Sequence, residues 1–469
     1  MTTVHAQRIP GPERFRPALV RDMMTNAPRA LTALRDRYGQ LVRVPLGPQT
    51  LHLLSDPDAI NDVLISSAKN FDSDIVGGSG ASGEREAPLA RLLGQGLLTS
   101  TGQQHRKQRK LLQPLFHRQR VAGYADAFAE IAEDRADRWS AGQRVDALVE
   151  MVELTLAVVT RTIFDVALDS DVTRTVRTAL PRNDGPLRYA MMPGGALLSR
   201  LPLPSNLQFI RGREALDAVV HRLITERRRA GATGSDLLSL LIAATDADTG
   251  EPMTDQQIRD EVLTLLMAGH DTTANALAWA LHLLGENPAS AARLESEVDD
   301  VLGDRLPGFA DLPRLPWTRA VLNEAMRIYP PVWTVARRAL APHTLLGHEV
   351  PADATVMMSA WVVHRDPRWW PAPERFAPQR WVERAPDGAT DNLTGTALVA
   401  ERPRFSYFPF GGGPRQCIGN EFALLEGAVV LATLARRWRL EPVPGSKVTP
   451  QAKIIVRPKG GLPMTVRAR

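Results

Sequence analysis

Apolar residues recur at helical spacing along most of this chain of 469 residues, and short alternating runs interrupt them near both ends. Residues 28–38 predict a helix, and the alternating runs LVRVPLG and QTLHLLS predict a β-hairpin that turns near Gly47 and Pro48. Residues 71–102 are rich in glycine and predict a loop, whereas helical periodicity dominates from there to about Leu284. The pattern favours a mainly helical protein with a smaller β region.

The helical pattern breaks once and later gives way to a mixed region. Residues 181–206 hold five prolines and three glycines among apolar residues, which stops a helix there. Because no linker, repeat or charge block divides the chain, we expect one domain over residues 1–469, after a flexible lead of about residues 1–17. In the last third, short strands are predicted at residues 354–363, 452–456 and 463–467.

The longest predicted helix carries residues that fit poorly inside a helix. Thr254 and Gln257 form a capping box, and the pattern then runs on to Leu284, which gives a helix of about 46 Å. Its middle is the hexapeptide AGHDTT at residues 268–273, where Gly and Asp are poor helix formers and a buried acid needs a partner. A local cost of this kind indicates a functional site, although a back-bonded threonine and a surface acid would be the plainer interpretation.

Cys417 is the only cysteine, and it lies in the run FGGGPRQCIG at residues 410–419. A single thiol cannot close an internal disulfide or supply the several thiolates of a structural zinc site or an iron–sulfur cluster. An inert buried thiol, a nucleophile and a single thiolate ligand to one metal remain. The glycines describe a tightly held backbone, and the apolar residues 422–434 predict a helix that begins just after Gly419, so its dipole would favour a thiolate.

The run around Cys417 has the form F-x-x-G-x-R-x-C-x-G and resembles the haem-binding loop of the cytochrome P-450 family. The resemblance implies the cytochrome P-450 fold, in which haem lies between a long central helix and the cysteine loop. It implies that Cys417 is the proximal thiolate ligand of the iron and that Arg415 reaches a haem propionate. Phe410, Gly411 and Gly419 would shape the loop around the haem.

The hexapeptide in the long helix resembles the oxygen-activation motif of the same family. By position, Ala268 and Gly269 would open the helix above the haem. Thr272 would orient oxygen and water, and Asp271 would relay protons through a hydroxyl and water chain, which is general acid catalysis. His270, between them, is interpreted as a packing residue rather than as a second iron ligand.

A charge network follows from the same resemblance. Glu324 and Arg327, ahead of two prolines, and Arg375, in the run PERF, match the family's charged residues behind the haem. Spacing alone makes the first pair commonplace, since a pair three residues apart on a helix is worth only tenths of a kcal/mol. The resemblance implies a structural network that is required for haem incorporation and has no chemical role.

Further haem contacts also follow by position. The run GQQHRKQRKLLQPLF resembles the family's propionate-binding helix and places His105 and Arg109 one helical turn apart on a common face. Arg337 occupies the other propionate-pairing position. Arg338 is its competitor, because adjacent side chains on a strand point to opposite faces and only one of the two can reach the haem.

Composition fits a large globular protein. Hydrophobic residues make up 44% and charged residues 23% of the chain, and a net charge of +5 is too modest to indicate nucleic acid as a partner. The N-terminal sequence shows neither the apolar core of a signal peptide nor a membrane anchor. We therefore expect a cytoplasmic protein, and the many Ala, Arg and Pro residues suggest a bacterial source.

The resemblance implies a haem-thiolate monooxygenase that contains haem b, iron protoporphyrin IX. It would activate O2 reductively and would hydroxylate or epoxidise a small lipophilic molecule, such as a terpenoid, fatty acid, steroid or polyketide of secondary metabolism. Because only 52 residues follow Cys417, electrons would come from NAD(P)H through separate proteins, a ferredoxin or flavodoxin and its reductase. A haem-dependent peroxygenase or isomerase and a non-catalytic haem sensor are the alternatives. The acid–alcohol pair of Asp271 and Thr272 favours dioxygen as the oxidant.

Five basic side chains cluster in the sequence near the presumed proximal face. They would suit an acidic ferredoxin or flavodoxin by electrostatic steering, whereas a solvated helix face is the plainer interpretation. We call this set the basic cluster; its members are Arg106, Lys107, Lys110, Arg118 and Arg120.

Four segments are candidates for the wall of a substrate pocket, because most of their side chains are apolar or small. This composition favours a lipophilic substrate without selecting one. The segments are residues 72–100, 191–195, 332–335 and 460–463.

Overall fold

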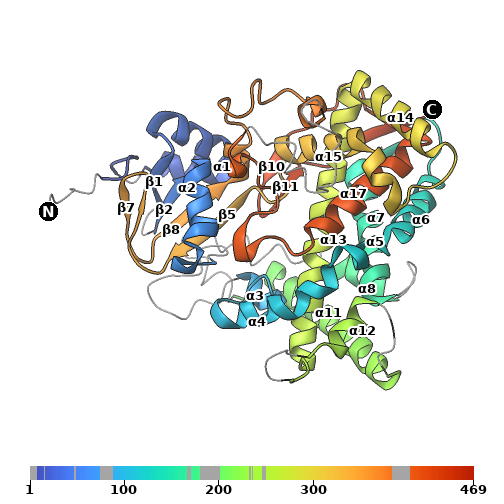
Figure 1. Cartoon of the computed structure of the whole chain (residues 1–469), viewed down its shortest axis with the longest axis horizontal. Coiled ribbons are helices and arrows are strands. Elements are labelled where there is room, and N and C mark those ends of the chain that lie inside the picture. The colour runs from blue at the N-terminus through green and yellow to red at the C-terminus, as the bar shows by residue number, and fades with distance from the viewer. Residues whose placement is uncertain are drawn as a thin grey trace. The chain divides into compact units, whose positions relative to one another are not determined.

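The computed structural model of the chain (Figure 1) divides into two compact units, which we call the cysteine unit and the helical unit. The cysteine unit comprises Met1–Asp74, Ala132–Met151 and Thr272–Arg469, and the helical unit comprises Ile75–Ile131 and Val152–Asp271. The expected single catalytic domain stays a prediction. Residues 1–7 and 15 of the expected flexible lead and the whole segment 191–195 lie outside the described residues. The structure describes residues 8–14, 16–46, 49–73, 88–165, 171–179, 201–231, 234, 236–245, 250–382 and 402–469.

The cysteine unit contains a five-stranded sheet in the order β1-β2-β8-β5-β3. The predicted hairpin is confirmed, because β1 and β2 pair antiparallel from Leu41 opposite Leu54 to Leu46 opposite Gln49. Strand β8 pairs parallel with β2, and the other pairings are antiparallel. The strands are β1 Leu41–Leu46, β2 Gln49–Leu54, β3 Phe71–Ser73, β5 Thr334–Ala339 and β8 Thr355–Ser359.

Helices of the cysteine unit pack closely around α17, which follows the cysteine loop. Helices α15 and α17 lie side by side, and a Cβ added at Gly427 of α17 would meet the Leu322 side chain at 2.6 Å, so the glycine allows this approach. The helices of this unit are α1 Pro17–Tyr38, α2 Pro57–Asn61, α14 Pro288–Leu302, α15 Pro316–Ile328, α16 Ala360–Val363 and α17 Asn420–Ala435.

The described part of the helical unit consists mainly of helices. Helix α11 packs against both α8 and α12. Its helices are α3 Pro88–Leu93, α4 Gly102–Leu112, α5 Arg118–Ala122, α8 Asp171–Ala179, α11 Pro204–Arg229 and α12 Leu237–Ala243. Three helices belong partly to each unit, and these are α6 Ala125–Ala136, α7 Ala147–Phe164 and α13 Asp255–Glu286.

Smaller sheets and short turns complete the described chain. Strand β12 is the centre of a three-stranded sheet, and two antiparallel pairs lie apart from it. These strands are β4 Arg144–Asp146, β6 His343–Leu345, β7 His348–Val350, β9 Trp438–Pro442, β10 Pro450–Ala452, β11 Val456–Pro458 and β12 Pro463–Ala468. The short 3-10 or π turns are η1 Asp62–Ser66, η2 Ala68–Asn70, η3 Gln113–Phe116, η5 Phe309–Arg314, η6 Pro378–Trp381, η9 Arg404–Ser406 and η10 Gly413–Arg415.

The long central helix matches its prediction closely. Helix α13 begins at Asp255, and the backbone N–H of Thr254 donates to Gln257 Oε1 at 2.8 Å while the N–H of Gln257 donates to Thr254 Oγ1 at 3.2 Å. These two bonds are the predicted capping box. In the part of the chain that the structure describes, no helix has both the length and the apolar character needed to cross a membrane.

Other predicted elements need correction. Helix α1 starts at Pro17 rather than at residue 28, and the non-helical backbone of Asn26 marks a kink just before Pro28. The predicted loop at residues 71–102 includes β3 and α3. Residues 354–363 form β8 and then α16, and residues 463–467 lie in β12 as predicted.

The strand predicted at residues 452–456 is wrong, because this segment is mostly the turn between β10 and β11. The N–H of Lys453 donates to the carbonyl of Ile455 at 3.1 Å. The Trp333 indole donates to the carbonyl of Lys453 at 2.8 Å, and the N–H of Val456 donates to the carbonyl of Pro331 at 2.9 Å. These tertiary bonds outweigh the strand propensity of the two isoleucines.

Candidate haem site and its surroundings

Cys417 lies at the end of a tight loop, just before helix α17, and its side chain is exposed. Its backbone N–H donates to the carbonyl of Phe410 at 3.0 Å, which closes the loop. An exposed thiol at the start of a long apolar helix is not the inert buried cysteine considered above. The position favours a thiolate, because the helix dipole places positive charge there.

The glycines of the cysteine loop are required for different structural reasons. A Cβ at Gly412 would meet the Phe405 ring at 2.5 Å, and one at Gly413 would meet the carbonyl oxygen of Leu64 at 1.8 Å. Gly411 has a φ of 67°, and its nearest neighbour for an added Cβ is Val335 at 3.9 Å. The loop is therefore packed tightly at Gly412 and Gly413, whereas at Gly411 there is room for a further atom.

Two arginines of the cysteine unit share one electrostatic environment. The pKa of Arg337 falls to about 10, first because of burial and then because of the nearby charge of Arg415, while Asp72 partly offsets both effects. Arg415 faces Asp72 at 3.4 Å. Within the described part of the chain, the Arg337 guanidinium donates a hydrogen bond to the carbonyl of Ala336 at 2.9 Å. An anion beside these arginines would therefore be stabilised.

Arg338, the competitor of Arg337, points to a different partner. It pairs with the exposed carboxylate of Asp353 at 2.9 Å. The alternation of side chains along β5 thus separates the two arginines as expected.

In the helical unit, α4 presents two distinct faces. His105 and Gln108 are buried and Arg109 is half-buried, so the predicted propionate partners lie on or beside the inward face. The side chains of Arg106, Lys107 and Lys110 are exposed. Arg118 and Arg120 in α5 are exposed as well, so every member of the basic cluster reaches solvent.

The hexapeptide lies near the middle of α13, at the boundary between the two units. Ala268 is exposed, and Gly269, Asp271 and Thr272 are half-buried. A Cβ at Gly269 would meet Val159 of α7 at 3.1 Å, so this glycine also has a packing reason.

His270 is the packing residue that the sequence indicated. Its side chain is buried, and its Nδ1 lies 2.8 Å from the carbonyl oxygen of Leu266 one turn earlier. Its own carbonyl accepts from the Thr155 hydroxyl of α7 at 2.9 Å. The Thr155 bond thus holds α13 against α7 at the position next to the half-buried Asp271 and Thr272.

The predicted charge network forms with one change. Arg327 and Glu324 are completely buried and make a two-bonded pair at 2.8 and 2.9 Å. Arg327 also donates to the carbonyls of His364 and Arg375, at 2.9 and 3.3 Å. The Arg375 side chain is exposed, so the prediction of its guanidinium inside the network is wrong; Arg380 instead approaches Glu324 at 3.4 Å.

The network is closed by neutral donors as well. Glu324 accepts from the N–H of Ala377 at 3.0 Å and from the Trp381 indole at 2.9 Å. Both charged groups of the Glu324–Arg327 pair therefore have hydrogen-bond partners, which a buried ion pair requires. Substituting one partner would leave the other charged and buried.

Two buried acids were missed in the sequence. Glu261 of α13 is fully buried; its Oε2 accepts from the N–H of Leu97 at 2.9 Å, and its Oε1 has no partner among the described residues. Glu426 of α17 is fully buried, and the side chain of Thr273 in α13 interacts with its carboxyl group. Burial raises the pKa of Glu426 well above its usual value, although Thr273 opposes this. The charge amid the apolar residues 422–434 was a usable signal for Glu426.

The candidate segments for the substrate pocket differ in whether they expose apolar side chains. Val332 and Ile454 are exposed apolar side chains on adjoining segments, since Pro331 and Trp333 bind the turn that contains Ile454. The segment 460–463 instead binds β4, with the N–H of Leu462 donating to Asp146 at 3.0 Å. The turn at residues 453–456 is therefore a better candidate for an apolar wall.

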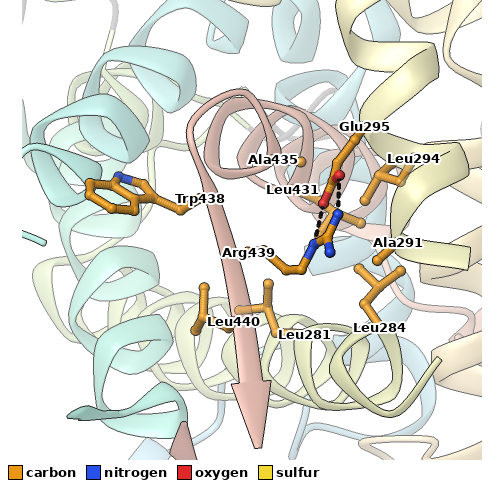
Figure 2. Close-up of a pocket in the computed structure, with 10 residues that line it drawn as sticks. All are labelled: Leu281, Leu284, Ala291, Leu294, Glu295, Leu431, Ala435, Trp438, Arg439 and Leu440. Carbon is orange, nitrogen blue, oxygen red and sulfur yellow. Dashed lines mark hydrogen bonds and ion pairs between the residues drawn. The ribbon is translucent and has the colours of Figure 1, made fainter. Parts of the chain in front are cut away.

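A separate small cavity lies within the cysteine unit. It measures about 20 Å³, which is room for about one water molecule, and Arg439 and Glu295 form an ion pair beside it (Figure 2). None of its ten lining residues belongs to the predicted site, so it is not the substrate pocket.

The described residues fit a haem bound through one thiolate. Cys417 is an exposed soft ligand, a Cβ added at Gly411 of the same loop would have no neighbour nearer than 3.9 Å, and Arg337 and Arg415 form a cationic pair suited to carboxylates. The cysteine unit therefore contains both a residue that could bind the iron and arginines that could bind the haem propionates.

Comparisons with known proteins agree with this arrangement. The family model described as cytochrome P450 matches residues 14–465. The crystal structure of the cytochrome P450DA heme domain is similar over 99% of this chain and 98% of its own, with a TM-score of 0.84 and 26% identity. This likeness confirms the predicted fold class.

Several curated relatives come from Streptomyces. Cyclooctatin synthase of Streptomyces melanosporofaciens is 38% identical over 92% of this chain and 90% of its own. Cyclooctat-9-en-7-ol 5-monooxygenase of the same organism is 37% identical, over 87% of this chain and 84% of its own. Pentalenene oxygenase of Streptomyces avermitilis is 33% identical, over 92% of this chain and 91% of its own.

Proposed function

The chain belongs to the cytochrome P450 family, and we propose from this premise that it oxidises a cyclic terpenoid with electrons from separate proteins. As a cytochrome P450 it is a haem-thiolate monooxygenase that contains haem b, uses dioxygen and acts on a lipophilic small molecule. The single observation that carries the site assignment is the exposed Cys417 at the end of its closed loop.

Each site residue then has a defined task. Cys417 would bind the iron, while Arg337 and Arg415 from its own unit, and His105 and Arg109 from α4, would bind the propionates. Haem with a thiolate ligand supplies the activation of dioxygen. Ala268 and Gly269 would leave space on α13.

The acid and the alcohol of α13 would manage the proton. Thr272 would hold a water or hydroxyl in place, and Asp271 would pass a proton to it from solvent, since both side chains are half-buried rather than sealed. We expect Thr272→Val to lower the oxygenated product formed per reducing equivalent, whereas Thr273→Val, its neighbour, should have a smaller effect. Equal yields in both variants would contradict the assignment of Thr272.

Cys417→Ser tests the iron ligand. The wild-type ferrous carbon monoxide complex should show the red-shifted absorption band of a thiolate ligand, and the variant should lose it. Product formation should require an electron donor, which separates a monooxygenase from a peroxygenase, an isomerase or a sensor. A variant that keeps the wild-type spectrum would remove Cys417 from the site.

The terpenoid proposal rests on the relatives and on exposed apolar side chains. Enzymes named for cyclooctat-9-en-7-ol and pentalenene are among the relatives that match over most of the chain. Val332 and Ile454 would offer such a substrate an apolar wall.

A binding titration can test the substrate class. Pentalenene and cyclooctat-9-en-7-ol should shift the ferric spin state at lower concentration than lauric acid does, and Ile454→Asp should weaken the terpenoid shift. Preferential binding of lauric acid would overturn the proposed class.

The basic cluster would dock an acidic ferredoxin or flavodoxin. All five side chains are exposed, and on α4 they lie opposite the buried His105 and Gln108. Lys107→Glu with Lys110→Glu should lower the reduction rate and weaken its dependence on salt. Lys447→Glu, an exposed change in the cysteine unit, is the matched control, and equal rates in all variants would end the docking proposal.

A further inference from the structure

Asp72 is a third charged residue beside the two arginines of the cysteine unit. It lies in β3, which pairs antiparallel with β5, so that Asp72 is opposite Arg338 and the next residue, Ser73, is opposite Arg337. Its Oδ1 accepts from the N–H of Ser73 at 2.7 Å, which holds the carboxylate close to its own backbone. The same oxygen faces Arg415 Nη2 at 3.4 Å. Strand pairing and two polar contacts therefore fix its position.

The carboxylate is only partly screened by water. The side chain of Asp72 is 21% exposed and that of Arg415 is 14% exposed. In such an environment charges interact more strongly than they do in bulk water. Asp72 raises the pKa of both Arg337 and Arg415, against the lowering caused by burial. The carboxylate thus stabilises two neighbouring cations that repel each other.

We propose that Asp72 is a charge-setting residue of the haem site, whose carboxylate competes with a haem propionate for Arg415. This inference rests on the proposed assignment of Arg337 and Arg415 to the propionates. Without haem, Asp72 offsets the repulsion between the two arginines. With haem, its negative charge repels the propionate and opposes the gain of an electron by the iron.

Asp72→Asn isolates this charge, because asparagine keeps the size of the side chain and an oxygen that accepts from Arg415. We expect the haem-loaded variant to lose haem to apomyoglobin roughly tenfold more slowly, the effect of removing one partly screened like-charge repulsion. Its ferric–ferrous midpoint potential should rise, because a negative charge near the iron is gone. Asp72→Glu keeps the charge and should restore a potential close to that of the wild type.

Asp353→Asn is the matched control. Asp353 pairs with Arg338, the neighbour of Arg337 on β5, but its side chain is 78% exposed. Its removal should change neither the haem loss rate nor the potential. A shift of equal size in this control would mean that any nearby charge acts in the same way, and would overturn a specific role for Asp72.

Two other results would overturn the proposed role of Asp72. Faster haem loss from Asp72→Asn at an unchanged potential, or a variant that accumulates no haem-bound protein, would make Asp72 a structural support and overturn the proposal. The wild-type ferrous carbon monoxide spectrum is recorded first. If it lacks the thiolate band, the proposed function fails; if it has the band and Asp72→Asn changes nothing, only the role of Asp72 fails.

Discussion

Glu261 gives a prediction whose size follows from the structure. This carboxyl group of α13 is completely buried, and burial raises its pKa to about 7, against the lowering caused by the Leu97 N–H and with a further increase from Asp260. Its usual value is 4.5. The folded protein therefore keeps a proton on Glu261 at pH values where the unfolded chain has lost it.

The sign of the effect on stability follows directly. Because the folded pKa is the higher one, the contribution of Glu261 is fully present below about pH 4.5 and is lost as the pH rises through about 7. Each unit of difference in pKa corresponds to about 1.4 kcal/mol, so the free energy of unfolding should fall by about 2.5 kcal/mol between pH 5 and pH 8 through this group alone.

Glu261→Gln removes the titration and keeps the shape of the side chain. We expect its free energy of unfolding, relative to the wild type, to rise by about 2.5 kcal/mol from pH 5 to pH 8. Urea unfolding of the haem-loaded proteins at both pH values measures this difference, and contributions of groups that titrate equally in both proteins cancel. Hydrogen exchange of residues 94–101 reports locally on the bond from the Leu97 N–H to Glu261.

Glu226→Gln is the control, since Glu226 lies in the same unit with a side chain that is 60% exposed. The stability of the Glu226→Gln variant relative to the wild type should not depend on pH. If the difference between Glu261→Gln and the wild type changes by less than about 0.5 kcal/mol over this range, Glu261 is ionised in the folded protein and the reasoning from burial is refuted.

Three further predictions follow from single contacts. Glu324→Gln should lower the free energy of unfolding in urea by about 3–5 kcal/mol, because it leaves Arg327 charged and buried. Arg375→Ala should lower it by less than about 1 kcal/mol, since only the Arg375 carbonyl joins the network. Gly413→Ala should lower the haem-bound fraction far more than Gly445→Ala, because both glycines have positive φ but only Gly413 faces a backbone oxygen, that of Leu64, at 1.8 Å. Glu426→Gln should destabilise the protein less than Glu324→Gln does in the same urea assay, because burial raises the pKa of Glu426 and so favours the uncharged acid that glutamine resembles; a loss as large as that of Glu324→Gln would contradict this reasoning.

Local signals made much of the fold and the cysteine loop predictable. The capping box of α13 needs only Thr254 and Gln257, and both bonds form. The helix after Gly419 follows from a mostly apolar run of residues, in which Glu426 is the charged exception. The prediction for the Arg375 side chain was wrong because the resemblance of the run PERF places the residue near the network but does not show whether its side chain or its carbonyl enters it.

Long-range contacts account for the features that sequence reasoning missed. The turn at residues 453–456 depends on bonds to Pro331 and Trp333, more than 100 positions away in the chain. Asp72 meets Arg415 across a sequence separation of 343. No periodicity or local motif carries information about such pairs.

The two arginine groups of the cysteine unit differ in how fully their charges are paired, which is why we propose that one is structural and that the other binds a ligand. Arg327 donates to Glu324 and to two carbonyls, and Glu324 accepts from the chain on its remaining sides, so the buried pair is saturated. Arg337 has a single hydrogen bond to the adjacent carbonyl among the contacts of the described residues, and it lies beside another cation. A saturated pair is stable without any ligand, whereas two neighbouring cations with one carboxylate are stabilised by a further anion. Haem loading should therefore depend on ionic strength through Arg337 and Arg415, and not through Glu324.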